Sequence, residues 1–100
     1  MFENDHPTLL DLQRYHRELD AVKGFYTDLY LNALLLQEEV GEVASAVTRL
    51  WCAERELGNL DAALDRQRDA LAEELADCLA YLVKLANYAG VNLEAAYLAK

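Results

Sequence analysis

The sequence contains two short acidic stretches, Gln37-Glu38-Glu39-Val40-Gly41-Glu42 and Glu73-Glu74-Leu75-Ala76-Asp77. Each lies in a long segment whose apolar residues recur every three or four positions, which is the spacing of a helix with one buried face. Residues three apart share a helix face, so Glu39 and Glu42 point one way on the first segment, as do Glu74 and Asp77 on the second. Carboxylates that point into a helix–helix contact need partners, because burying an unpaired charge is costly.

A break at Gly58-Asn59 separates the two segments and predicts an antiparallel helical hairpin. Residues equidistant from position 58 then lie level with each other, which pairs Glu42 with Glu74 and Glu39 with Asp77. At a rise of about 1.5 Å per residue, both pairs lie roughly 24–29 Å from the turn. We therefore expect four acids to converge between two helices.

Capping residues indicate where the helices begin and end, and no segment alternates with the period of a strand. We expect a first helix capped by Thr8 that ends near Lys23-Gly24, and a second capped by Thr27 or Asp28 that runs to about Leu57. A third helix, capped by Asn59 or Asp61, is expected to run to Ala89, and Asn92 can cap a short last helix from Leu93 to Lys100. The expected fold is all-α, a single domain over residues 1–100 in which a long antiparallel hairpin is joined by an N-terminal helix and a short C-terminal helix. One face of the first helix is marked by Leu9, Leu12, His16, Leu19 and Val22.

The run Cys78-Leu79-Ala80-Tyr81-Leu82-Val83 is apolar around the whole helix. A helix of this kind is enclosed on most sides, which a chain of 100 residues does poorly alone. We therefore expect the helices to assemble into a larger bundle by homo-oligomerisation, with a tightly folded monomer as the alternative.

A formal net charge of −9 limits the partners. Nucleic-acid phosphates would be repelled, so we expect no nucleic-acid partner. The chain lacks the roughly 18 consecutive apolar residues of a membrane span, and its acidic start is unlike a secretory signal. We expect no membrane partner and a cytoplasmic location, with Cys52 and Cys78 as reduced thiols.

The acidic cluster predicts a metal site. Ligands that are all oxygen and strongly negative select hard cations, Mg²⁺ above all, with Mn²⁺ as a substitute. Such sites serve phosphoryl chemistry, and Glu38 is a further carboxylate able to orient or deprotonate water. Each acidic stretch alone is common on a solvated helix face, so the prediction depends on their shared register. A di-iron site is disfavoured, because those bundles need Glu-x-x-His and His6 and His16 are not so placed.

These motifs carry a resemblance to a known family. Glu-Glu-x-x-Glu and Glu-x-x-Asp, the run Cys-Leu-Ala-Tyr-Leu-Val-Lys-Leu-Ala from Cys78, and the ending Gly90–Lys100 resemble the MazG-like all-α nucleoside triphosphate pyrophosphohydrolases over about Leu34–Lys100. The resemblance implies a dimer or a dimer of dimers, and Mg²⁺-dependent cleavage of a nucleoside triphosphate to monophosphate and pyrophosphate. By motif position it implies the metal ligands Glu39, Glu42, Glu74 and Asp77. It also implies Glu38 as an accessory ligand or water-positioning base, so Glu38 and Glu39 are the catalytic candidates.

Further positions are candidates for binding the substrate. Tyr81 lies where the family has an aromatic residue near the sugar or base, with a core aromatic as the alternative. Lys100 matches a lysine in the family's Lys-Met-x-x-Asn ending, which contacts phosphates. Lys84 or Asn87 is a candidate for the remaining phosphate contacts, although a solvated charge is the alternative for Lys84. Trp51 is a candidate to stack on a base across a dimer interface, with packing as its alternative role.

Two other functions stay open beside the nucleoside triphosphate pyrophosphohydrolase. The related phosphoribosyl-ATP pyrophosphohydrolases have similar acidic helices and a similar small size. A non-catalytic helical module that binds nucleotide or regulates a partner would also keep the bundle.

Overall fold

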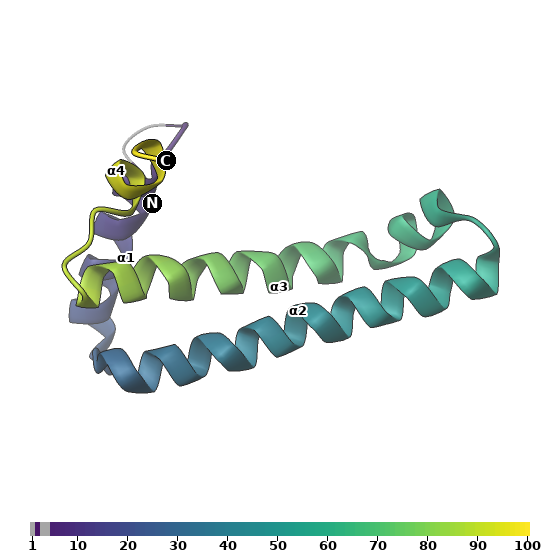
Figure 1. Cartoon of the computed structure of the whole chain (residues 1–100), viewed down its shortest axis with the longest axis horizontal. Helices are drawn as coiled ribbons and strands as arrows, with labels where there is room; N and C mark the ends of the chain where they lie inside the picture. The colour runs from purple at the N-terminus through teal and green to yellow at the C-terminus, as the bar shows by residue number, and fades with distance from the viewer. Residues whose placement is uncertain (1, 3–4) are drawn as a thin grey trace. The chain divides into compact units, whose positions relative to one another are not determined.

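The computed structural model describes residues 2 and 5–100. This part of the chain folds into four helices and no strands: α1 (Leu9–Lys23), α2 (Leu29–Leu57), α3 (Leu60–Tyr88) and α4 (Leu93–Leu98) (Figure 1). The predicted all-α fold and the order of its helices are confirmed. The helices α3 and α4 end slightly before the predicted residues.

Polar side chains and glycines set the helix boundaries. The Thr8 hydroxyl accepts a hydrogen bond from the Asp11 N–H, and the Asp11 carboxylate accepts one from the Thr8 N–H, which together form a capping box at α1. Asp28 accepts a hydrogen bond from the Leu31 N–H at 2.7 Å and so caps α2. Gly58 has a φ of 70°, a conformation that favours glycine, and Asn59 then caps α3.

The described chain divides into two compact units. One unit is the hairpin of residues 36–79, built from the later part of α2 and the earlier part of α3. The other unit contains the described residues up to Leu35 together with Ala80–Lys100, and so includes α1 and α4. The organisation as one domain stays a prediction.

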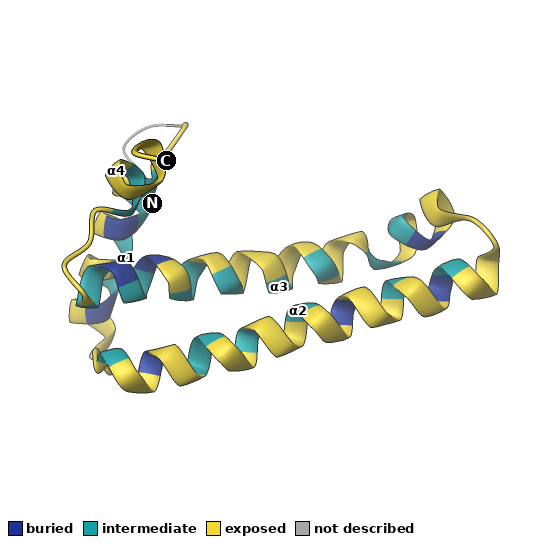
Figure 2. Ribbon diagram, viewed as in Figure 1, coloured by how far each residue is buried: buried dark blue, intermediate teal, exposed yellow. Residues whose placement is uncertain are grey.

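The hairpin unit has a narrow core of small residues. Its buried apolar residues are Ala46, Ala53 and Ala63, whereas Trp51 is 58% exposed and Leu75 is 51% exposed. Most of the ribbon of this hairpin has the colour of exposed residues (Figure 2). Gly41 is exposed, and a Cβ placed on it would meet no atom of the described residues within 4 Å. Gly41 therefore does not serve close packing of the two helices within the chain.

The other unit buries polar side chains beside apolar ones. Val83 and Ala86 are buried there, together with Gln13, Asp20 and Asn32. Of the residues expected to mark one face of α1, four are half-buried, namely Leu9, Leu12, His16 and Leu19, whereas Val22 is 81% exposed. The buried residues of α1 are Gln13 and Asp20.

Gln13 joins α1 to the segment between α3 and α4. Its Nε2 donates to the Asn87 Oδ1 at 3.0 Å and to the Val91 carbonyl at 2.8 Å. Its Oε1 accepts a hydrogen bond from the Leu93 N–H at 2.9 Å. A buried amide whose donor and acceptor are both used in this way fixes the relative positions of these elements.

Among the described residues, none of the helices combines the length and the apolar character needed to cross a membrane.

Candidate functional site

Three carboxylates meet between the two helices of the hairpin unit. Glu39 of α2, together with Glu74 and Asp77 of α3, offers ligand oxygens that all lie within 4.8 Å of one another. Glu74 and Asp77 are three residues apart on a helix, so both side chains project toward the same turn of α2. We call these three residues the acidic trio.

The electrostatics of the acidic trio show that its members repel one another. Partial burial raises the pKa of Glu39 above its ordinary value, and the charges of Asp77, Glu74, Glu38 and Glu42 raise it further. Like charges that share a site favour the protonated form of one of them. A cation among these oxygens would remove that repulsion.

The donor set fits a hard divalent cation. Around an octahedral Mg²⁺ with oxygens at about 2.1 Å, neighbouring oxygens lie about 3.0 Å apart and opposite ones about 4.2 Å apart. The oxygens of the trio lie within 4.8 Å of one another. The three side chains would therefore have to bring their oxygens closer together to bind one ion. Three carboxylates leave positions for water or for phosphate oxygens. Burial and the charges of the trio also raise the pKa of the neighbouring Cys78 thiol, which keeps it protonated and a poor ligand.

The two other acids of the first stretch lie outside this trio. Glu42 was expected to pair with Glu74, but the described carboxylates that come together are those of Glu39, Glu74 and Asp77. Glu38 and Glu42 are both exposed, and each contributes to the raised pKa of Glu39. Ligation by Glu42 and water positioning by Glu38 stay predictions.

Lys84 is not the solvated charge that was the alternative expected for it. Its side chain is 12% exposed, and its Nζ lies 3.4 Å from the Oδ1 of Asp20. The same Nζ lies 5.1 Å from the centre of the Phe25 ring and 5.2 Å from that of the half-buried Tyr81. The charge of Lys84 is thus balanced within the protein, which leaves it poorly suited to hold a phosphate.

Asn87 is also engaged within its own unit. Its Oδ1 accepts hydrogen bonds from Gln13 and, at 3.2 Å, from the Nη2 of Arg17. Its Nδ2 donates to the Gln13 carbonyl at 2.8 Å. This arrangement makes Asn87 a structural residue, and a contact with substrate would have to replace one of these bonds.

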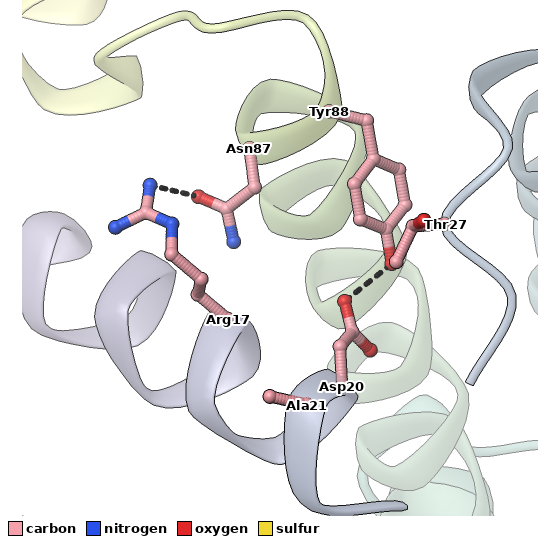
Figure 3. A pocket seen from close by; sticks show the side chains of 6 residues that line it. All are labelled: Arg17, Asp20, Ala21, Thr27, Asn87 and Tyr88. Carbon is pink, nitrogen blue, oxygen red and sulfur yellow. Dashed lines mark hydrogen bonds between the residues drawn. The ribbon is translucent and has the colours of Figure 1, made fainter. Parts of the chain in front are cut away.

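A cavity of about 260 Å³ opens beside these residues (Figure 3). Its lining consists of Arg17, Asp20, Ala21, Thr27, Asn87 and Tyr88. The Tyr88 hydroxyl donates a hydrogen bond to the Asp20 carboxylate at 2.5 Å, and burial together with this bond raises the pKa of Tyr88. The cavity wall is therefore fixed by charged and hydrogen-bonded groups.

The two remaining candidates lie at the surface. Trp51 is exposed on α2, with the guanidinium of Arg55 at 5.5 Å from its ring centre. Lys100 is exposed and its backbone N–H donates to the Tyr97 carbonyl at 3.1 Å. Their roles in substrate binding stay predictions.

Sequence reasoning missed Asp20, Phe25 and Tyr88. The signal for Asp20 was present, because Gln13, His16 and Asp20 follow helical spacing within a segment that also carries Leu9 and Leu12. Polar residues at such spacing indicate a buried polar network when their partners lie on another helix. Nothing in the spacing identified Lys84 and Tyr88 as those partners.

Comparison with known proteins gives two concordant results. A family model described as the MazG nucleotide pyrophosphohydrolase domain matches residues 29–99. The cattle protein named dCTP pyrophosphatase 1 is 41% identical over 96 residues, and its human counterpart is 40% identical over the same length. In both cases the match covers 94% of this chain and 55% of the relative, so the chain spans about half the length of the curated relatives it matches.

Proposed function

The chain belongs to the MazG nucleotide pyrophosphohydrolase family, and we propose that it hydrolyses a nucleoside triphosphate to the monophosphate and pyrophosphate. The single observation that carries this proposal is the acidic trio, whose oxygens lie within 4.8 Å of one another. The names of the relatives make deoxynucleoside triphosphates, and dCTP first, the substrates to test. The expected role is the removal of unwanted nucleotides in the cytoplasm.

We assign the residues of the site as follows. Glu39, Glu74 and Asp77 would hold Mg²⁺, or Mn²⁺ in its place, with the exposed carboxylate of Glu42 as a further ligand. A bound divalent ion would neutralise charge on the phosphates and on the transition state. Glu38 is exposed next to Glu39 in α2 and orients or deprotonates the attacking water.

The exposed apolar surface of the hairpin unit supports a homodimer or a dimer of dimers. Large side chains that are 40% exposed or more on this unit are Val40, Val47, Trp51, Leu57, Leu60, Leu75 and Leu79. Pairing with a second copy would remove apolar surface of these side chains from water, which favours association. Light scattering coupled to size-exclusion chromatography should give a mass of two or four chains, and a mass of one chain would contradict this part of the proposal.

Product analysis tests the activity. The protein is incubated with each common ribo- and deoxynucleoside triphosphate and with phosphoribosyl-ATP, with Mg²⁺ or with a chelator. We expect Mg²⁺-dependent release of pyrophosphate from a deoxynucleoside triphosphate, and loss of that release in Asp77→Asn. Release of orthophosphate alone would refute the proposal, cleavage of phosphoribosyl-ATP alone would favour the related enzyme, and no cleavage would favour a binding module.

A further inference from the structure

The side chain of Lys84 lies between two aromatic rings and a buried carboxylate. Its Nζ is 5.1 Å from the ring centre of Phe25 and 5.2 Å from that of Tyr81. A cation at this distance from a ring face is attracted by the negative face of the aromatic system. One ammonium group therefore holds both rings, which come from distant parts of the sequence.

Asp20 fixes the position of this ammonium group. The Asp20 side chain is 6% exposed, and its Oδ1 accepts no hydrogen bond from the described residues but lies 3.4 Å from the Lys84 Nζ. Its Oδ2 accepts the hydrogen bond from Tyr88 at 2.5 Å. A carboxylate held from one side by a tyrosine and paired on the other with an ammonium has little freedom to move.

We propose that Lys84 is a positioning residue for the nucleoside part of the substrate, holding the rings of Phe25 and Tyr81 in place while Asp20 and Tyr88 hold Lys84. The proposal rests on the proposed function, in which Tyr81 lies against the sugar or base. It assigns Lys84 a role different from the phosphate contact expected from the sequence. An ammonium already paired with a buried carboxylate has little net charge to offer a phosphate.

The two roles predict different binding patterns, which can be measured without turnover. Binding of deoxycytidine, dCMP and the α,β-imido analogue of dCTP is measured by calorimetry in Mg²⁺ for the wild-type protein, Lys84→Met and Lys84→Arg. The matched control is Lys23→Met, which changes an exposed lysine at the end of α1. If Lys84 positions the rings, Lys84→Met weakens all three ligands by the same factor of about five to ten, and Lys84→Arg restores most of the affinity.

A phosphate role gives the opposite pattern. The loss in Lys84→Met would then be absent for deoxycytidine and would grow from the monophosphate to the triphosphate analogue, which would overturn the proposal. Unchanged affinity for all three ligands, or no binding of deoxycytidine by the wild-type protein, would also overturn it. If Lys84→Met weakens all three ligands equally but the wild-type protein releases no pyrophosphate, the proposed function fails and the positioning role stands.

A second measurement does not depend on any ligand. The ε-methylene group of Lys84 is one bond from an Nζ that lies over two rings, so its proton NMR signals should be shifted upfield from the positions of a solvated lysine. Asp20→Asn should move them toward those positions, and signals at solvated positions in the wild-type protein would overturn the proposal. Should Lys84→Met fail to fold, the double variant Asp20→Asn/Lys84→Met keeps the site neutral and takes its place in the binding series.

Discussion

Asp20→Asn tests the contribution to stability of the buried polar network that Asp20 forms with Lys84 and Tyr88. The Asp20 side chain is 6% exposed, and its ion-pair partner Lys84 is 12% exposed at a distance of 3.4 Å. The amide would leave the Lys84 cation buried without its counter-ion and would remove the charged acceptor from the Tyr88 hydroxyl. Removing one partner of a buried ion pair lowers the free energy of unfolding by about 3–5 kcal/mol. Because Lys84 still interacts with the faces of two aromatic rings, we expect the decrease to be about 3 kcal/mol.

This loss is large enough to measure by thermal and urea-induced unfolding, followed by circular dichroism. For a domain of this size, about 3 kcal/mol lowers the midpoint of thermal unfolding by roughly 12–24 °C. The matched control is Asp65→Asn, which removes an exposed ion pair with Arg68 at 3.1 Å and should cost less than about 1 kcal/mol. The double variant Asp20→Asn/Lys84→Met should recover most of the stability, because it leaves no unpaired charge. If Asp20→Asn unfolds at the same temperature as Asp65→Asn, the reasoning about this network is refuted.

Three further predictions concern titration and backbone freedom. The pKa of Glu39 is raised above 4.5, so the metal-free protein should lose stability as the pH rises from 4.5 through the pKa of the folded state. The variant Glu39→Gln should remove this pH dependence from the midpoints of thermal unfolding. An unchanged pH dependence in Glu39→Gln would argue against repulsion in the trio. Burial and the charge of Lys84 lower the pKa of His16 below 6.5, although the charge of Asp20 opposes them. The contribution of neutral His16 to stability is therefore present above pH 6.5 and is lost as the pH falls through the pKa of His16 in the folded state. An NMR titration midpoint of His16 at or above pH 6.5 would contradict this. Gly41→Ala should raise the free energy of unfolding by about 0.5–1 kcal/mol, because alanine favours the helix more than glycine does. The added Cβ would meet no atom of the described residues within 4 Å. A lower denaturation midpoint would show that position 41 is more crowded than the structure indicates.

Much of the fold could be predicted because its boundaries depend on local chemistry. The turn at Gly58 and Asn59 depends on the positive φ of Gly58 and on a hydrogen bond between residues three apart. The caps at Thr8 and Asp28 likewise use hydrogen bonds between residues three apart. Once the turn is known, the rise of the helix fixes which residues lie level, and this brought Glu39 to Asp77. Glu74 joins them, because Glu74 and Asp77 share one helix face and both point to the same turn of α2.

The polar network of the other unit could not be predicted in this way. Asp20 and Lys84 belong to α1 and α3, and no spacing rule relates positions so far apart in the sequence. The choice between Val22 and Asp20 as inward-facing residues of α1 depends on what α3 presents to it. A lysine, an aspartate and a tyrosine can be buried together in place of apolar residues when they form an ion pair and a hydrogen bond with one another. The spacing of apolar residues does not reveal such a polar contact.

Binding of a divalent cation to the acidic trio is the central claim, and the midpoint of thermal unfolding against Mn²⁺ or Mg²⁺ concentration tests it most directly. A cation that binds the folded state alone stabilises it by about 2.7 kcal/mol at one hundred times its Kd, which corresponds to a rise of roughly 10–20 °C. The account predicts this rise for the wild-type protein and for Glu73→Gln, which changes an exposed acid next to the trio, and its loss in Glu39→Gln. An equal rise in Glu39→Gln, or no rise in the wild-type protein with or without nucleotide, would contradict it.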